Sequence, residues 1–364
     1  MAVRVRSGDG KGAAVQEGRA DFSRRGLLAG LGAAGAVTAL LPAQGRTRQP
    51  GPVPRMRVII DNDFSGDPDG LFQLAHHVLS PSVEIPLIVG SHLHVADPWD
   101  PSLTQAGNGA AAARELLAVM GRAGRYRVLA GADAAIPTRS GWSQSPATAA
   151  IVREALREDT DLPLYYAAGA GLTELALAWL AEPRIGRRLR LVWIGGGEHP
   201  GFAPPPPGKA VPEYNLTIDL LAAQVIFNES DIEIWQVPRD AYRQMLIGYS
   251  ELDELAATGA TGRYLKSRID RLLERIAKVP PARRPRLGET YILGDSPLVT
   301  LTALQSSFEP DPSSSSHAVL PTPVLDDAGG YRPAPGGRTM RVYTRIDTRL
   351  TFADLAAKLR AIPS

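Results

Sequence analysis

The stretch Arg57-Val58-Ile59-Ile60-Asp61-Asn62-Asp63 decides the fold, because it joins a short β-branched run to carboxylates at its end. Such a run predicts a strand that is buried on both faces. Similar runs predict strands at 83–89, 126–129, 164–168, 190–194 and 232–237, with helices at 71–79, 106–122, 172–181 and 220–228. This alternation predicts a single Rossmann-like α/β domain, with a mostly parallel central sheet flanked by helices. We expect the functional site at the carboxyl ends of the strands.

The composition excludes several kinds of site. The chain has 364 residues and no cysteine, so disulfide scaffolds, thiolate metal sites and thiol nucleophiles are ruled out. Any metal ligand must therefore offer oxygen or nitrogen. The first fifty residues hold eight basic and three acidic side chains, whereas the remaining 314 hold 32 basic and 35 acidic ones. The body of the protein is slightly acidic, and we expect no nucleic-acid partner.

The basic N-terminus has the pattern of an export signal. Ser23-Arg24-Arg25-Gly26 leads into an apolar, Gly- and Ala-rich run of sixteen residues at 26–41. We predict a twin-arginine signal peptide at 1–45, a linker at 46–55 and a mature domain at 56–364. The apolar run is shorter than the roughly 20 residues that span a bilayer, so no stable membrane anchor is expected. The predicted location is periplasmic or secreted.

Four carboxylates crowd the end of the first predicted strand, in Asp61-Asn62-Asp63-Phe64-Ser65-Gly66-Asp67-Pro68-Asp69-Gly70. They would repel one another unless a cation lay among them, and all-oxygen donors favour calcium or magnesium. Three alternatives compete. An EF-hand loop lacks its bidentate Glu, because the twelfth position is Phe72. An aspartyl-phosphate phosphatase would use Asp61 as the nucleophile. A capped loop, in which Asp67 caps a helix opened by Pro68, explains only one of the four acids.

The chain resembles the inosine/uridine nucleoside hydrolase family, which opens with a strand and an Asp-x-Asp motif around one calcium ion. The resemblance runs in order from Arg57 to Leu359. Beyond the acidic segment, it rests on Gly169-Ala170-Gly171-Leu172-Thr173, on Ile194-Gly195-Gly196-Gly197 followed by Glu213-Tyr214-Asn215, and on Leu293-Gly294-Asp295-Ser296-Pro297. Each segment alone is weakly specific, but four in the right order make a fairly specific signal.

The resemblance implies a calcium-dependent hydrolase that cleaves the N-glycosidic bond of ribonucleosides or a related N-riboside, and the predicted signal peptide implies that it is exported. It places the metal ligands at Asp61, Asp63, Asp67, the Gly169 carbonyl and Asp295. It makes Asp63 the base that activates a water on the face opposite the leaving base. It assigns Asp69, Glu213 and Asn215 to the sugar hydroxyls; for Glu213 and Asn215 the alternative is a polar junction between a loop and a helix. Members of the family are commonly dimers or tetramers, so a homo-oligomer is compatible with the resemblance.

Two departures bear on the mechanism. Where the family has two adjacent Asp residues, this chain has Asp67-Pro68-Asp69-Gly70, so either Gly70 or a displaced acid takes one of the two positions. In addition, Gly294 stands where many members carry a proton-donating His. The candidates for protonating the leaving base are His199, which we rank first, and His92, His94 and Tyr291. Trp99 either stacks on the base or anchors its loop. These departures keep a second function open, a calcium-stabilised nucleoside- or sugar-binding protein without turnover.

Overall fold

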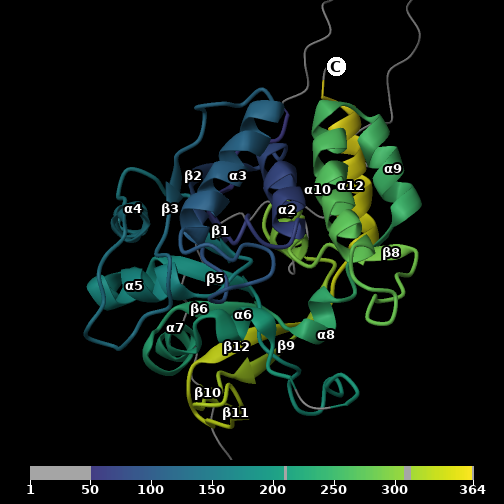
Figure 1. The fold of residues 1–364 in the computed structure, drawn as a ribbon. Coiled ribbons are helices and arrows are strands. Elements are labelled where there is room, and N and C mark those ends of the chain that lie inside the picture. The colour runs from purple at the N-terminus through teal and green to yellow at the C-terminus, as the bar shows by residue number, and fades with distance from the viewer. Residues whose placement is uncertain (1–50, 209–210, 307–312, 363–364) are drawn as a thin grey trace, which may run out of the picture. The chain divides into compact units, whose positions relative to one another are not determined.

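Eight strands form the central sheet of the computed structural model, in the order β3-β2-β1-β4-β5-β6-β12-β9 (Figure 1). The structure describes residues 51–362 apart from 209–210 and 307–312, so the predicted signal peptide at 1–45 and residues 46–50 of the predicted linker lie outside the described residues. The strands are β1 (Met56–Asn62), β2 (Val83–Gly90), β3 (Val128–Ala130), β4 (Leu164–Ala168), β5 (Leu189–Ile194), β6 (Glu233–Val237), β9 (Ser316–Pro321) and β12 (Thr339–Arg345). Neighbouring strands run parallel except β9, which is antiparallel to β12.

Strand β1 is buried along its whole length, as its apolar sequence predicts. Val58 and Ile60 pack into the hydrophobic cluster on one face of the sheet, and Ile59 packs into the cluster on the other. Side chains alternate between the faces of a strand, so an unbroken apolar run requires cover on both sides. The predicted α/β architecture with a mostly parallel sheet is confirmed.

Helices supply that cover. The face that buries Val58 packs against α2 (Asp69–Val78), α3 (Gln105–Val119), α9 (Tyr249–Ala257), α10 (Ala260–Ala277) and α12 (Thr348–Arg360). The opposite face packs against α4 (Pro146–Ala155), α5 (Thr173–Ala181) and α7 (Leu220–Gln224). The predicted helix at 220–228 is α7 followed by a π-helical turn, Val225–Glu229. None of the helices in the described part of the chain is long and apolar enough to cross a membrane.

The order of the strands fixes where a ligand can bind. Strand β1 lies at the centre, with β2 and β3 on one side and β4, β5 and β6 on the other. Crevices form beyond the carboxyl ends of strands where the chain reverses its direction across a sheet. Here that point lies between β1 and β4, whose ends are paired through Asp61 and Ala168. The residues that follow, Asn62 and Asp63 after one strand and Gly169 after the other, therefore come together.

Candidate active site

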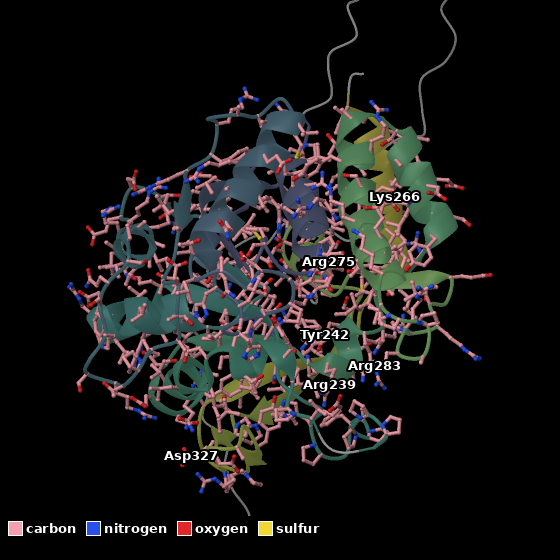
Figure 2. The ribbon with its side chains drawn as sticks, in the orientation of Figure 1. Arg239, Tyr242, Lys266, Arg275, Arg283 and Asp327 are labelled. Carbon is pink, nitrogen blue, oxygen red and sulfur yellow. The ribbon has the colours of Figure 1, made fainter. Side chains whose placement is uncertain are left out.

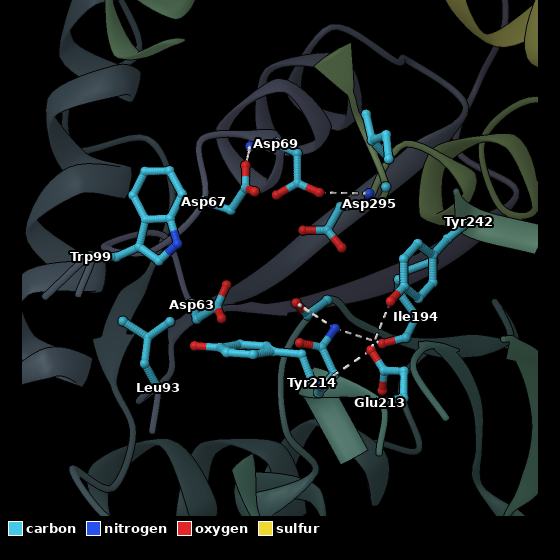
Figure 3. A pocket seen from close by; sticks show the side chains of 14 residues that line it. Asp63, Asp67, Asp69, Leu93, Trp99, Ile194, Glu213, Tyr214, Tyr242 and Asp295 are labelled. Carbon is cyan, nitrogen blue, oxygen red and sulfur yellow. Dashed lines mark hydrogen bonds between the residues drawn. The ribbon is translucent and has the colours of Figure 1, made fainter. Parts of the chain in front are cut away.

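A pocket of about 290 Å³ opens at this point (Figure 3). Five carboxylates line it, together with aromatic, apolar and amide side chains and two glycines. The lining residues are Asp63, Asp67, Asp69, Leu93, Trp99, Gly169, Ile194, Glu213, Tyr214, Asn215, Tyr242, Ile292, Gly294 and Asp295. The pocket thus contains eight of the ten residues that the sequence assigned to the site; the two that it does not contain are Asp61 and His199.

Four of the five acids come from three separate segments. Asp63 follows β1, Asp67 and Asp69 lie at the start of α2, and Asp295 precedes the short helix α11 (Pro297–Thr300). Figure 3 shows their carboxyl groups around a common region between Trp99 and Tyr242. The first turn of α2 and the loop before α11 are joined directly, because the backbone N–H of Asp295 donates to Asp69 Oδ2 at 3.1 Å.

Gly169 must be a glycine for the acids to pack this closely. A Cβ atom here would lie 2.3 Å from Asn62 Nδ2 and 2.8 Å from the Asp295 carboxyl carbon. Asn62 Nδ2 itself donates to Asp295 Oδ2 at 2.8 Å, while the buried Asn62 Oδ1 has no hydrogen-bond partner among the described residues. Asn62 is a component of the site that the sequence did not single out, although it stands between two predicted acids.

The acids in the pocket repel one another. Burial raises the pKa of Asp63 well above its usual value, and the charge of Asp295 raises it further. Burial likewise raises the pKa of Asp69, followed by repulsion from Asp295 and Asp67. The pKa of Asp295 rises to about 7, mainly through burial. Within the described part of the chain, no Lys, Arg or His lines the pocket to offset this charge.

Asp67 and Asp69 both line the pocket, whichever of them matches the family's motif. Tyr291, one of the four candidates for the proton donor, donates its hydroxyl to Asp67 Oδ1 at 2.5 Å. The same oxygen accepts from the backbone N–H of Asp69 at 3.3 Å. The helix α2 takes Pro68 as its N-cap residue, without a side-chain capping bond. Asp67 thus accepts one backbone N–H at the start of the helix, as the capping alternative expects, but capping accounts for none of the other acids.

Glu213 and Asn215 combine the two roles that the sequence left open. Glu213 is the N-cap of α6 (Tyr214–Ile218) and accepts from the backbone N–H groups of Gly196 at 2.7 Å, Leu216 at 2.9 Å and Asn215 at 3.1 Å. The Tyr242 hydroxyl donates to the same carboxylate at 3.0 Å. Asn215 Nδ2 donates to the carbonyls of Ile194 at 2.8 Å and Gly169 at 3.4 Å. Both side chains are structural and also line the pocket.

Asp61 lies beneath the pocket and does not line it. Its side chain is fully buried, and its two oxygens accept from the hydroxyls of Ser91 and Tyr166. Burial raises the pKa of Asp61 to about 7. A phosphatase nucleophile must be reached by its substrate, so this burial speaks against the phosphatase alternative. The role of Asp61 as a metal ligand stays a prediction.

The histidines that the sequence proposed as acids do not line the pocket. His92 Nε2 is 2.9 Å from Thr173 Oγ1, and His94 packs edge-on against Tyr214. His199 stacks on Tyr331 with the ring centroids 4.3 Å apart, and its Nε2 lies 2.7 Å from Gln236 Oε1. Burial lowers the pKa of His199. The catalytic role of His199 stays a prediction.

Tyr242 occupies the space beside Gly294. A Cβ at Gly294 would lie 3.3 Å both from the Tyr242 ring and from Asp69 Oδ2. Tyr242 and Tyr214 are the two phenols of the pocket lining, and the sequence did not assign either to the site. Tyr214 stands inside the quoted Glu-Tyr-Asn segment, which was a usable signal. Tyr242 comes five residues after β6 ends, and strand-end position was the only signal for it.

The donor set has the chemistry that a hard cation prefers. Carboxylate oxygens and a backbone carbonyl are typical calcium ligands, and buried carboxylates without a counter-charge favour a cation among them. In the region that the structure describes, however, no group of three or more His, Asp and Glu side chains is already placed to hold a metal ion. The chemistry of these oxygen donors nevertheless fits calcium.

Comparison with known proteins adds the family. The family model described as inosine-uridine preferring nucleoside hydrolase matches residues 58–351. Two curated proteins of that description match short stretches: the one from Crithidia fasciculata is 46% identical over 68 residues, 18% of this chain and 19% of that protein, and the one from Leishmania major is 48% identical over 61 residues, 16% and 18%. The matched stretch spans about a fifth of these relatives' length.

Solved structures share the fold. A purine-preferring ribonucleoside hydrolase from Gardnerella vaginalis has a TM-score of 0.63 at 18% identity and covers 84% of this chain and 98% of its own. An inosine-uridine preferring nucleoside hydrolase from Bacillus anthracis has a TM-score of 0.59 at 18% identity, with 84% and 99% covered. At this identity the likeness concerns the fold alone.

Proposed function

The chain belongs to the inosine-uridine preferring nucleoside hydrolase family, and we propose that it is an N-glycosyl hydrolase that cleaves ribonucleosides or a related N-riboside with calcium bound. One observation carries the proposal: Asp63, Asp67, Asp69 and Asp295 line a single pocket together with the aromatic side chains of Trp99, Tyr214 and Tyr242. A pocket that offers both carboxylates and aromatic rings suits a ligand that is part sugar and part base.

Asp63 is proposed as the base. Its raised pKa and its place on the pocket wall suit it to take a proton from the water that attacks C1′. The metal would be held by Asp63, Asp67, Asp295 and the Gly169 carbonyl, with Asp61 as the further predicted ligand. When bound, calcium supplies positive charge that offsets the repulsion among these acids and polarises the reacting water.

The remaining side chains are proposed to bind the two halves of the substrate. The sugar hydroxyls would donate hydrogen bonds to the carboxylates of Asp69 and Glu213 and would bond to the amide of Asn215. These bonds would orient the sugar carbon C1′ for attack by the water. Trp99 lies across the pocket from Tyr242 in Figure 3 and offers a flat apolar face for the base.

His199 is the proposed donor of the proton that the departing base needs, and its position outside the pocket lining makes a direct test necessary. A p-nitrophenyl riboside has a leaving group that departs without protonation. If His199 is the acid, His199→Ala lowers kcat for inosine and leaves kcat for the p-nitrophenyl riboside unchanged. If His199→Ala has the same kcat as the wild type for inosine as well as for the p-nitrophenyl riboside, His199 is not the acid.

A specific observation favours the second candidate, a calcium-stabilised nucleoside- or sugar-binding protein without turnover. Gly294 carries no ionisable group, and the ring of Tyr242 fills the space beside it. Binding needs the pocket but no proton donor at this position.

A nucleoside panel separates the two functions. Purified protein is incubated with purine and pyrimidine ribonucleosides, with calcium or with a chelator, and free base and ribose are measured. Release of both in the calcium arm supports the hydrolase. Calorimetric binding of a nucleoside without any release would overturn it in favour of the binding protein. Asp253→Asn, a change at an exposed acid of α9, serves as the control and should behave like the wild type.

We further propose that the protein is exported by the twin-arginine route and acts in the periplasm or outside the cell. The support is the Arg24-Arg25 pair ahead of the short apolar run. Replacing both residues by lysine keeps the charge and should retain the precursor inside the cell. Unchanged export of that variant would contradict the proposal.

A further inference from the structure

The loop formed by residues 91–104 contributes Leu93 and Trp99 to the wall of the pocket. Asp97 joins this loop to α6, the helix that carries Asn215. Asp97 Oδ1 accepts from the backbone N–H of Trp99 at 2.8 Å, and Asp97 Oδ2 accepts from the Tyr214 hydroxyl at 2.6 Å. Asp97 is only 5% exposed. The backbone of Trp99 is thereby tied to the helix that carries Asn215.

Arg275 of α10 holds the same loop from the other side. Its guanidinium donates to the carbonyl of Pro98, and its Cζ lies 5.4 Å from the centroid of the Trp99 ring. A guanidinium at this distance from an indole ring makes a cation–π contact. Figure 2 shows Arg275 on α10 between Lys266 and Tyr242. Trp99 lines the pocket and Arg275 does not, so the arginine can act on a ligand only through the tryptophan.

The loop depends on such external contacts for its position. Val95 and Leu103 are each 80% exposed, so the loop buries few apolar groups of its own. Ala96 has φ of +57°, a left-handed conformation that is unfavourable for a residue with a side chain. Gln105 of α3 fixes the backbone on either side of Trp99, because it accepts from the N–H of Leu93 at 2.9 Å and donates to the carbonyl of Asp100 at 2.7 Å. The contacts of Asp97 and Arg275 hold the exposed part of the loop around Trp99 itself.

We infer that Arg275 is a positioning residue that fixes Trp99 as the wall against which the leaving base binds. This inference rests on the proposed function, because it assigns the Trp99 side of the pocket to the base. Arg275 touches neither the sugar nor the acids of the pocket. Its loss should therefore weaken the binding of the base and leave the chemical step unchanged.

Arg275→Met tests the inference, because it keeps the aliphatic stem and removes the charge and the donors. We expect KM for inosine to rise about tenfold and kcat to stay within about twofold, given the ordinary strength of one cation–π contact and one charged hydrogen bond. The inhibition constant of free ribose should not change. Arg275→Lys keeps a cation and should restore part of the loss. Arg271→Met, at an exposed arginine one turn earlier on α10, is the matched control and should leave KM unchanged.

A double variant identifies the route of the effect. If Arg275 acts through Trp99, Trp99→Ala combined with Arg275→Met is no worse than Trp99→Ala alone. Three results would each overturn the inference. They are an unchanged KM for inosine in Arg275→Met, a rise in the inhibition constant of ribose equal to the rise in KM for inosine, and a double variant whose KM shows the two single effects multiplied. The dissociation constant of inosine for wild type and Arg275→Met, measured by calorimetry, makes the test independent of turnover. Failure of the hydrolase proposal alone would leave the binding difference in place.

Discussion

Two groups of buried carboxylates lie near the carboxyl ends of the central strands, and they differ in how their oxygens are satisfied. Asp61, Glu174 and Asp219 form the first group, which lies outside the pocket lining. Glu174 accepts from the backbone of Ala132 at 2.6 Å and from two hydroxyls at 2.8 and 2.9 Å. Asp219 accepts from two backbone N–H groups, at 2.8 and 2.9 Å, and from the Thr173 hydroxyl at 2.8 Å.

The second group consists of Asp63, Asp67, Asp69 and Asp295, which line the pocket. Burial and the charges of three other acids raise the pKa of Asp63, and only its own backbone N–H lowers it. Asp69 accepts one backbone hydrogen bond from Asp295 and is repelled by that residue's carboxylate. Several donors of the fold surround each carboxylate of the first group, whereas the carboxylates of the second group repel one another and so favour a cation among them. Glu174 and Asp219 are therefore held as parts of the fold, whereas the second group is the one that we propose to bind the metal and the substrate.

The largest expected effect that sharpens this comparison is on turnover. Asp63→Asn should lower kcat for nucleosides about 10³-fold, because the amide cannot take a proton from the attacking water. The variant should be as stable as the wild type, since the change removes a repelled charge. Initial rates and thermal unfolding measure the two quantities. Retained turnover would remove Asp63 as the base.

A second prediction concerns the free energy of unfolding, on which we expect the first group to have a larger effect than the second. Asp219→Ala leaves three buried donors without an acceptor and should lower the free energy of unfolding by about 3 kcal/mol. Asp63→Ala should lower it by less than about 1 kcal/mol, because few donors depend on that carboxylate. Urea unfolding of both variants gives the difference. Equal losses would break the distinction between a structural and a functional group.

Calcium should distinguish the groups as well. A ligand present at a hundred times its dissociation constant stabilises the folded state by about 2.7 kcal/mol, so calcium should raise Tm by roughly 5 °C. A chelator should reverse the shift. Asp295→Asn should abolish it, whereas Glu174→Gln should retain it. A shift that survives Asp295→Asn would place the cation elsewhere.

The smallest expected effect concerns substrate charge. Five carboxylates line the pocket, and within the described residues no Lys or Arg accompanies them. A 5′-phosphate on the nucleoside should therefore lower kcat/KM at least about tenfold through repulsion. Parallel assays of inosine and its 5′-monophosphate at two salt concentrations check this. Equal efficiency for both would show that the acids are fully neutralised by bound metal.

Much of the sheet could be predicted because its strands are apolar on both faces. The strand at 164–168 is observed as predicted, and those at 83–89, 190–194 and 232–237 differ by one residue at one end. Strand β12 was not predicted, because only three of its seven residues are buried and its sequence contains several charged and polar side chains. Helix α4 was also missed, although Ser145 begins it with a capping box. Helix α4 has only ten residues, so fewer than three turns carry its periodic pattern.

The site was predicted as a list of residues but not as an arrangement. Asp61 and Asp63 are two positions apart and would share a face in a regular strand. Strand β1 ends at Asn62, so Asp63 leaves the strand geometry and lines the pocket while Asp61 stays buried with Ser91 and Tyr166. Arg275 and Trp99 are far apart in the sequence, and no local pattern connects them.

The sequence by itself determined the parallel α/β sheet, the acidic strand end and the glycine beside it, because local periodicity and residue chemistry are properties of neighbouring positions. Only the tertiary structure decided which acids are enclosed by donors of the fold and which line the pocket, that Tyr242 fills the space beside Gly294, and that Arg275 meets Trp99. Burial and hydrogen-bond satisfaction depend on side chains brought together from distant segments, and a linear pattern does not contain that information.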